Sequence, residues 1–374
     1  MRTILHIGMS KTGTTALQEA FARSRKVLAG RGVLYPRNPP GGPQRNHQVI
    51  ACGLAPFERL PREFHSRYRD AETARAAFDD FAGMLGARLG EARPEVLLLS
   101  GESMFRVLNA TAARRLVDLI GDPGGDPGRD LGGEVRVAAY VRRPSEHFLS
   151  HIQQAMRYSH RPRPARGREI LPVLDSYARL FGAGAIDARP FEREIMADGD
   201  VVSDFCARHL ADRGVTRAEL AAPAFVNESL SAEASDISRR YRAAFHPGKD
   251  RFSPDSKALL AELADIDNRL GPKRPRLRPG LGEALDYAST EPLALRERYG
   301  IEFAGLDYGR LERGELVRPP AGRLDLDAIL VIDRERRCAV FDALRGSPWA
   351  DMAERRIWIE RELGSLASLE AAGA

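Results

Sequence analysis

The feature of this sequence that most restricts its fold is a strand, a tight loop and a helix that follow one another within the first thirty residues. Residues 3–8 (TILHIG) form a short apolar run ahead of a glycine-containing loop, which predicts a buried strand. Beyond the loop, Leu17, Phe21 and Leu28 recur at the spacing of one helical face. A strand that leads directly into a helix is typical of a parallel α/β unit.

The alternation of strands and helices continues over about the first two hundred residues. Residues 96–100 (VLLLS) form an uninterrupted apolar run, which is typical of a strand buried on both faces of a parallel sheet. Further strands are predicted at 135–141 and 186–191, and loops rich in glycine and proline at 31–47 and 121–133. Helices are predicted around 78–89, 111–120, 145–158, 170–182 and 201–211. This order predicts a three-layer α/β fold with a mostly parallel central sheet flanked by helices.

The remainder of the chain has a different pattern. Two amphipathic helices are predicted, one starting near Ser231 and one carrying Leu259 and Leu263. The composition shifts at about residue 318, so we expect a main domain over 1–318 and a C-terminal extension over 319–374. In the extension, 329–333 and 338–341 could pair as a hairpin, followed by a helix over about the last 25 residues. A homodimer contact, if the chain forms one, is expected in this extension.

Composition and charge exclude several classes of protein. The 57 lysines and arginines nearly balance 52 aspartates and glutamates, without a long basic block, which argues against a nucleic-acid-binding protein. The cysteines Cys52, Cys206 and Cys338 are odd in number and widely spaced, as expected for buried thiols in a reducing compartment. No apolar stretch reaches 18 residues, and the N-terminal run is too short for a signal peptide. We therefore expect a cytoplasmic protein without stable membrane insertion.

The loop between the first strand and the first helix has the composition of a phosphate-binding loop. It reads GMSKTGTT over residues 8–15. The N-terminus of a helix presents unpaired N–H groups and the positive end of the helix dipole, and hydroxyls at Thr14 and Thr15 could add donors. Lys11 precedes Gly13, whereas the lysine of a Walker A motif follows its second glycine, so the usual ATP-binding loop is not matched. The alternative is a glycine-containing turn before a well-capped helix.

The run HIGMSKTGTTALQ resembles the 5′-phosphosulfate-binding loop of sulfotransferases that use 3′-phosphoadenosine 5′-phosphosulfate (PAPS), especially their bacterial and glycan-modifying branches. This resemblance implies a P-loop-like fold in which Ser10, Lys11, Thr12, Gly13, Thr14 and Thr15 surround the donor's 5′-phosphosulfate. It also implies that Lys11 contacts the bridging oxygen and stabilises the departing phosphate. Thr14 and Thr15 would hold the 5′-phosphate.

A second anchor for the donor is indicated by residues 141–154 (VRRPSEHFLSHIQQ). Arg142 lies at the carboxyl end of a predicted strand, where ligands bind in open α/β sheets, and Ser150 lies on the following helix. A guanidinium and a hydroxyl suit a phosphate dianion. The sulfotransferases have an arginine, a proline and a serine at this spacing in their 3′-phosphate site, so the resemblance implies that role here. The alternatives are a surface ion pair and an ordinary helix hydroxyl. The resemblance covers about residues 1–235 well and 236–310 loosely.

Transfer of a sulfuryl group is an in-line displacement that needs a base near the acceptor. Glu102 directly follows the strand at 96–100, and glycan sulfotransferases carry a catalytic glutamate after the corresponding strand, which implies that Glu102 is the base. His47, in the loop sequence RNHQ, is the alternative, because the related cytosolic enzymes use histidine. No HExxH motif occurs, and we expect no metal, with Lys11 and helix dipoles neutralising charge instead.

The resemblance thus implies a PAPS-dependent sulfotransferase that modifies a hydroxyl or amine of a small molecule, glycan or lipid. One alternative is a nucleotide kinase with an atypical P-loop, which would need Mg²⁺ and would leave Arg142 and Ser150 without a purpose. The other is a non-catalytic nucleotide-binding or assembly protein on the same fold.

Overall fold

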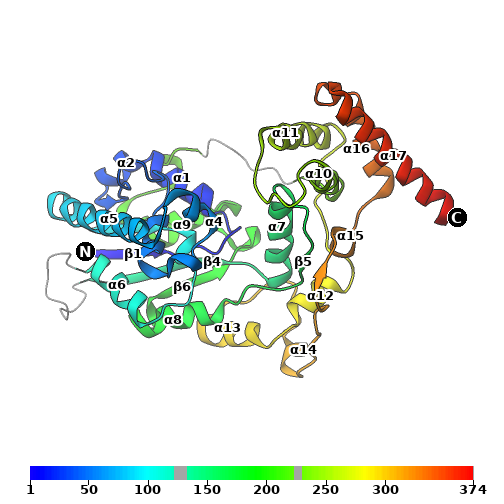
Figure 1. Ribbon diagram of the computed structural model, residues 1–374. Helices are drawn as coiled ribbons and strands as arrows, with labels where there is room; N and C mark the ends of the chain where they lie inside the picture. Colours follow the sequence, from blue (N-terminus) through cyan, green and yellow to red (C-terminus); the bar gives the residue numbers. More distant parts are fainter. Residues whose placement is uncertain (122–132, 223–229, 374) are drawn as a thin grey trace. The chain divides into compact units, whose positions relative to one another are not determined.

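The computed structural model describes residues 1–121, 133–222 and 230–373, and its contacts divide the chain into two compact units (Figure 1). Unit 1 comprises Met1–Arg143, Glu169–Phe225 and Thr290–Arg313. Unit 2 comprises Pro144–Arg168, Val226–Ser289 and Gly314–Ala374. These units differ from the predicted division at residue 318, because two internal segments group with the C-terminal residues. Most of the predicted loop at 121–133 lies outside the described residues.

Unit 1 is built on a five-stranded sheet in which every pairing is parallel. The order across the sheet is β2-β3-β1-β4-β6, so β1 is central. The strands are β1 (Arg2–His6), β2 (Val33–Leu34), β3 (Val96–Ser100), β4 (Val135–Val141) and β6 (Ile186–Pro190). The prediction of an α/β fold with a mostly parallel central sheet is confirmed.

One strand of the five-stranded sheet was not predicted. Val33 and Leu34 lie in the segment expected to be a loop, but they pair with Val96 and Leu97 of β3 as an edge strand. A two-residue strand is too short to show periodicity, so only its partner strand reveals it.

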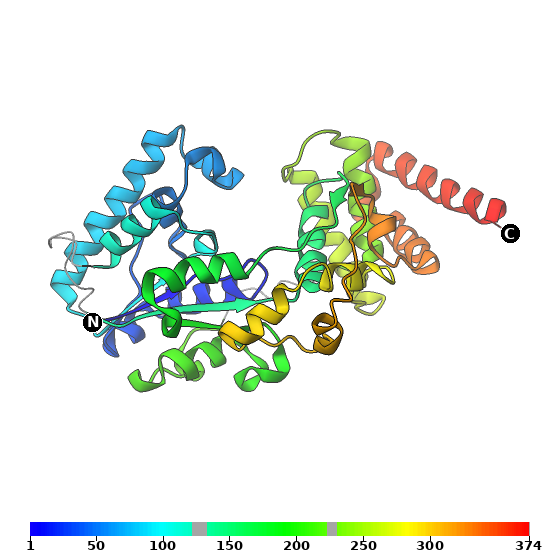
Figure 2. The same ribbon diagram turned by 90° about the horizontal axis from the view of Figure 1, so that it is seen from below.

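Helices cover both faces of this sheet (Figure 2). On one face, Ile4, Leu98 and Tyr140 pack against α1 (Thr14–Arg23) and α9 (Val201–His209). On the other face, alternate strand residues pack against α5 (Ala71–Ala92), α6 (Ala110–Ile120) and α8 (Leu171–Phe181). Because both faces are covered, all five residues of β3 are buried, as its continuous apolar run predicted. The other helices of the unit are α2 (Arg25–Gly30), α3 (Ala51–Leu54), α4 (Arg62–Arg67), α13 (Glu291–Tyr299) and α14 (Tyr308–Glu312).

The strand order has a consequence for ligand binding. From the central β1 the chain first builds β2 and β3 on one side, and then β4 and β6 on the other. Open parallel sheets bind ligands at the carboxyl ends of the strands where the order reverses in this way. In unit 1 this edge carries the residues that directly follow β1, β3 and β4.

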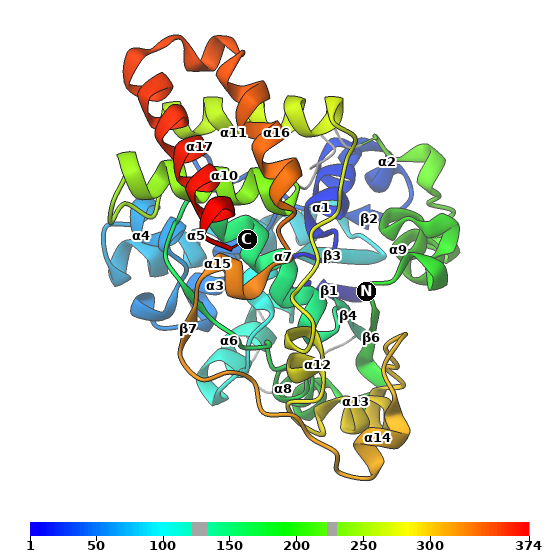
Figure 3. The same ribbon diagram turned by 90° about the vertical axis from the view of Figure 1, so that its right-hand side faces the viewer.

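Unit 2 is mainly helical. Its helices α10 (Ala232–Phe245), α11 (Pro254–Arg269), α16 (Arg334–Arg345) and α17 (Ala353–Gly373) pack around a core that includes Tyr241, Leu263, Phe341 and Trp358 (Figure 3). Its remaining elements are α7 (Pro144–Met156), α12 (Leu281–Asp286), α15 (Leu326–Ile329) and an antiparallel pair, β5 (Arg163–Pro164) and β7 (Arg323–Leu324). None of the helices in the described parts of either unit is both long and apolar enough to cross a membrane.

The predicted hairpin in the C-terminal extension is wrong, because residues 334–345 form α16. Asp333 begins this helix by accepting a hydrogen bond from the N–H of Arg336 (3.1 Å). Val340, Phe341 and Leu344 then lie on one helical face, buried in the core of unit 2. Short apolar runs suit a strand or a buried helix equally, and here the cap and the packing select the helix. The predicted C-terminal helix is confirmed by α17.

A fully buried carboxylate joins two helices of unit 2. Asp236 of α10 accepts hydrogen bonds from Arg239 (2.8 Å), Arg240 (2.7 Å) and Arg337 of α16 (3.1 Å). Burial alone would raise the pKa of Asp236, but Arg239 and Arg240 more than compensate and hold the pKa below its ordinary value. The folded state therefore depends on the ionised form of this side chain.

We expect Asp236→Asn to lower the free energy of unfolding by about 3–5 kcal/mol at neutral pH, because Arg239 and the buried Arg337 lose their nearest counter-charge. Since the pKa is lowered in the folded state, this contribution is complete above about pH 4 and is lost as the pH falls through the folded-state pKa. Urea unfolding at several pH values measures the difference. Asp79→Asn is the control, because its pair with Arg75 is exposed and should contribute less than about 1 kcal/mol. Equal effects of the two substitutions would contradict the prediction.

Candidate functional site

The loop between β1 and α1 has an unusual backbone. Lys11 and Gly13 both have a φ of 71°, which lies in the left-handed region. For a lysine this conformation costs on the order of 1–2 kcal/mol, and strain of this kind collects at functional sites. Inside the loop, the buried Thr12 hydroxyl donates a hydrogen bond to the carbonyl of Met9 (2.6 Å). The loop therefore has a fixed, curled shape, and the Thr12 hydroxyl proton is used to hold it.

The first turn of α1 presents unpaired donors. Gly13 is the N-cap and supplies no side-chain cap, and its carbonyl accepts from the N–H groups of Ala16 (2.9 Å) and Leu17 (3.2 Å). Within the described residues, the N–H groups of Gly13, Thr14 and Thr15 make no backbone hydrogen bond. Such N–H groups, at the positive end of a helix dipole, form a site for an anion.

Two glycines of the loop fit only because they lack a side chain. A Cβ on Gly8 would overlap the methyl group of Thr14 and lie 2.9 Å from Nε2 of His6. A Cβ on Gly13 would lie 2.8 Å from a methyl carbon of Val201 and 2.9 Å from the ring of Phe191. The loop is therefore packed tightly against β1, α1 and the segment that connects β6 to α9.

Glu102 lies next to the start of α1. It begins a 3-10 turn (Glu102–Met104) one residue after β3, and its carboxylate accepts a hydrogen bond from the hydroxyl of Thr14. The pairing of β1 with β3, which sets His6 opposite Ser100, brings the two strand ends together. The structure thus joins two residues that are 88 positions apart in the sequence, one from the phosphate loop and one predicted as the base.

A buried polar network lies beneath this pair. His6 Nδ1 is 2.8 Å from the hydroxyl of Ser100, which also accepts from the amide of Gln18 (3.2 Å). Asn46 in turn donates to Gln18 (3.3 Å). Burial, with a smaller effect of His209, lowers the pKa of His6 to about 3, so its ring is neutral. The network fixes the ends of β1 and β3 against α1 and the loop before His47.

His47 is fully buried, and both of its ring nitrogens are engaged. Nδ1 accepts a hydrogen bond from the N–H of Ser100 (2.9 Å), while Nε2 lies 3.0 Å from the carbonyl of Pro36. Because a backbone N–H can only donate and a carbonyl can only accept, the proton must reside on Nε2. Burial lowers the pKa of His47 to about 4, although the hydrogen bond to Pro36 opposes this. In this arrangement His47 fastens its loop to β3, and neither nitrogen is open to an acceptor.

Arg142 and the loop approach the same aromatic ring. Val141, the last residue of β4, pairs with Pro190 of β6, and the N–H of Phe191 donates to the carbonyl of Val141 (2.7 Å). The guanidinium carbon of Arg142 lies 4.6 Å from the centre of the Phe191 ring, a cation–π contact. An edge atom of this ring also lies 2.9 Å from the position of a Cβ on Gly13. Phe191 was not predicted as a site residue; its position at the end of a predicted strand was the only indication.

Buried polar contacts fix the segment that carries Phe191. The carboxylate of Asp204, on α9, accepts from Arg189 of β6 (2.7 Å), from the hydroxyl of Tyr140 of β4 (2.7 Å) and from the N–H of Ala197 (3.1 Å). Burial and the hydrogen bond to this carboxylate raise the pKa of Tyr140. Phe191 therefore lies on a segment tied to two strands and a helix.

Ser150, the predicted partner of Arg142 at the 3′-phosphate, lies half-buried on α7 in unit 2, whereas Arg142 belongs to unit 1. The joint site of Arg142 and Ser150 therefore stays a prediction. Among the residues that the structure describes, no group of three or more His, Cys, Asp or Glu side chains could hold a metal ion.

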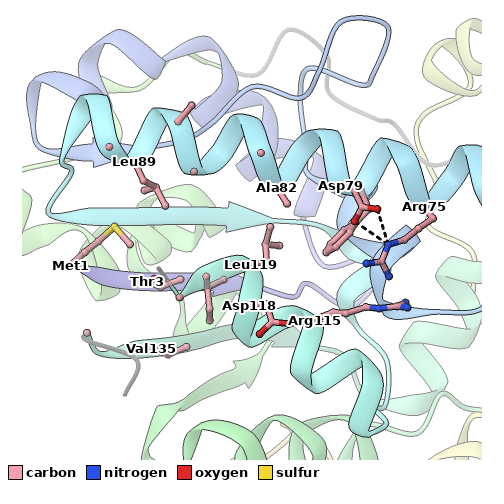
Figure 4. Close-up of a pocket in the computed structure, with 18 residues that line it drawn as sticks. Met1, Thr3, Arg75, Asp79, Ala82, Leu89, Arg115, Asp118, Leu119 and Val135 are labelled. Carbon is pink, nitrogen blue, oxygen red and sulfur yellow. Dashed lines mark hydrogen bonds and ion pairs between the residues drawn. The ribbon is translucent and has the colours of Figure 1, made fainter. Parts of the chain in front are cut away.

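A cavity of about 790 Å³ lies elsewhere in unit 1 (Figure 4). It opens between α5 and α6 and reaches Met1, Thr3 and Val135 at the amino ends of the strands. The Arg75–Asp79 ion pair (2.9 Å) lies on its α5 side. None of the predicted site residues lines it, so the cavity is distinct from the site around the loop.

Comparisons with known proteins add no relative from which residue roles could be transferred. The geometry of the loop, Glu102, Arg142 and Phe191 is therefore the basis on which a function is assigned. No protein-family model matches the chain, and neither a curated protein nor a solved structure matches it.

Proposed function

We propose that this chain is a PAPS-dependent sulfotransferase whose P-loop-like nucleotide site lies at the carboxyl edge of β1, β3 and β4. It would transfer the sulfuryl group of PAPS to a hydroxyl or amine of a small molecule, a glycan or a lipid. The proposal is carried by the Phe191 ring, which Gly13 of the phosphate loop and the Arg142 guanidinium both contact. The donor is one nucleotide with two phosphorylated ends separated by a ribose, and two anion-binding groups beside one aromatic ring suit such a ligand.

The two halves of the donor meet different chemistry in this proposal. The N–H groups at the start of α1 receive the 5′-phosphosulfate, together with the side chains of Ser10, Lys11, Thr14 and Thr15. Arg142 receives the 3′-phosphate through its planar guanidinium. The left-handed backbone at Lys11 helps to curl the loop.

In the transfer step, an acceptor oxygen or nitrogen attacks the sulfur in line with the bridging S–O bond. The new bond to sulfur forms as the bridging bond breaks, and adenosine 3′,5′-bisphosphate leaves with the bonding electrons. Glu102 takes the acceptor's proton, and the ammonium group of Lys11 stabilises the charge that develops on the leaving phosphate. Glu102 suits the role better than His47, whose nitrogens are both hydrogen-bonded in the interior.

Stabilisation by nucleotides separates this function from its alternatives. In the presence of EDTA, adenosine 3′,5′-bisphosphate at 100 times its Kd should stabilise the protein by about 2.7 kcal/mol, which corresponds to about 3–6 °C in Tm. Adenosine 5′-monophosphate, which lacks the 3′-phosphate, should give a smaller shift at the same concentration. A larger shift with ATP and Mg²⁺ would favour the kinase, and binding without sulfuryl transfer would favour a non-catalytic protein.

The contribution of Phe191 can be tested by the same measurement of nucleotide binding. Phe191→Leu should weaken adenosine 3′,5′-bisphosphate about tenfold, which is about 1.4 kcal/mol and within the range of a cation–π contact, because Arg142 loses its support. The matched control is Phe57→Leu, a half-buried aromatic that packs on α4 residue His65 away from the loop. Equal nucleotide affinity in both variants would contradict a shared site for Gly13 and Arg142.

A further inference from the structure

Glu102 and the 5′-phosphate of the proposed donor both need the hydroxyl proton of Thr14. Thr14 donates its hydroxyl proton to the carboxylate of Glu102, while the proposed donor needs that hydroxyl for its 5′-phosphate. A threonine hydroxyl has one proton, and an ionised carboxylate and a phosphate dianion are both acceptors only. Thr14 can therefore serve either Glu102 or the phosphate, but not both at once.

The surroundings of Thr14 keep its side chain in place for either role. The residue is buried, with 2% of its surface exposed, and its methyl group packs so closely on Gly8 that a Cβ there would overlap it. Its oxygen is thereby fixed at the start of α1, next to the unpaired N–H groups. A change of partner needs rotation of the O–H bond alone.

We propose that donor binding transfers the Thr14 hydrogen bond from Glu102 to the 5′-phosphate, so that Glu102 becomes an effective base only when the donor is in place. This inference rests on the proposed sulfotransferase function. A hydrogen bond to a carboxylate stabilises its ionised form, and the loss of that bond makes the carboxylate a stronger base. The arrangement would delay deprotonation of the acceptor until a sulfuryl group is present to receive its electrons, and Thr14 is then a positioning residue for Glu102.

The other ionisable groups of this site do not take up protons at about pH 5. His6 and His47, from β1 and the loop that packs on β3, are buried and neutral at pH 5, because burial lowers their pKa to about 3 and about 4. Lys11, on the loop, and Arg106, four residues after Glu102 in the sequence, belong to residue types that ordinarily titrate far above this pH. A change in protonation that depends on both Thr14 and Glu102 is therefore specific to their contact.

Proton uptake on nucleotide binding tests the proposal without an acceptor. Adenosine 3′,5′-bisphosphate is titrated into the full chain at about pH 5 by calorimetry, in buffers of different ionisation enthalpy. If Glu102 loses its hydrogen bond on binding, the parent should take up more protons than Glu102→Gln. Thr14→Ser, which keeps the hydroxyl, should match the parent, whereas Thr14→Val, an isostere without it, should lose at least half of this excess.

The outcomes separate the inference from the function on which it rests. If the parent chain does not bind adenosine 3′,5′-bisphosphate at all, the sulfotransferase proposal fails, and the inference fails with it. If the parent binds, but either Thr14→Val or Glu102→Gln takes up as many protons as the parent, Thr14 does not exchange Glu102 for the phosphate. The sulfotransferase proposal then still stands. Circular dichroism of each variant confirms that the comparison is between folded proteins.

Discussion

Replacing Lys11 with glycine is expected to reduce sulfuryl transfer by at least about 10²–10³-fold while leaving the fold as stable as before or slightly more stable. The loss of rate follows from removal of the ammonium group that stabilises charge on the leaving phosphate. The gain in stability follows from the φ of 71°, because the relief of about 1–2 kcal/mol of strain exceeds the entropic cost of glycine, about 0.5–1 kcal/mol. A residue that lowers stability and is kept in this conformation is typical of a functional loop.

Two companion variants separate charge from conformation. Lys11→Ala removes the charge and keeps the strain, so it should lose transfer equally but be less stable than Lys11→Gly. Lys11→Arg keeps the charge and should retain part of the activity. Transfer is measured with radiolabelled PAPS and cell extract as the source of acceptors, and stability by urea unfolding. Full activity in Lys11→Gly would show that Lys11 takes no part in the transfer step. If Lys11→Gly were less stable than Lys11→Ala, the left-handed backbone at Lys11 would not be strained.

The parts of the fold that were predictable are those whose cause is local. The strands at 96–100 and 135–141 are buried on both faces of the sheet, so continuous apolar runs identify them. The short strand β2 depends on its pairing with β3, and the helix α16 on its cap at Asp333 and on its packing in unit 2. Neither of these causes can be read from a window of a few residues.

The residues of the candidate site also divide into those with a local cause and those that depend on distant contacts. Lys11 and Glu102 directly follow predicted strands, so the sequence places both at one edge of the sheet. Phe191 reaches Arg142 through the register of β4 and β6, which pairs Val141 with Pro190 and is not visible in the sequence. His47 shows the reverse case, because a histidine in a polar loop is expected to be exposed, whereas this loop folds back onto β3 and buries it.

Replacing Glu102 with glutamine is expected to lower the rate of transfer by about 10²–10⁴-fold and to leave the affinity for adenosine 3′,5′-bisphosphate nearly unchanged. Glutamine has the same shape, and its amide oxygen can accept the hydrogen bond from Thr14, so the start of α1 and the phosphate loop should keep their geometry. The amide cannot take up the acceptor's proton, and only the chemical step should suffer. Labelling of extract acceptors from radiolabelled PAPS gives the rate, and calorimetry gives the affinity.

His47→Gln is the matched comparison, because it tests the other predicted base with the same kind of substitution. Since both nitrogens of His47 hold the loop on β3, this variant should lose stability, while its folded fraction should still transfer sulfate. An active Glu102→Gln together with a folded but inactive His47→Gln would reverse the assignment. The base would then be His47. Its ring would have to break the contacts with Ser100 and Pro36 before each reaction. In that case, opening of the 36–47 loop would limit the rate of transfer.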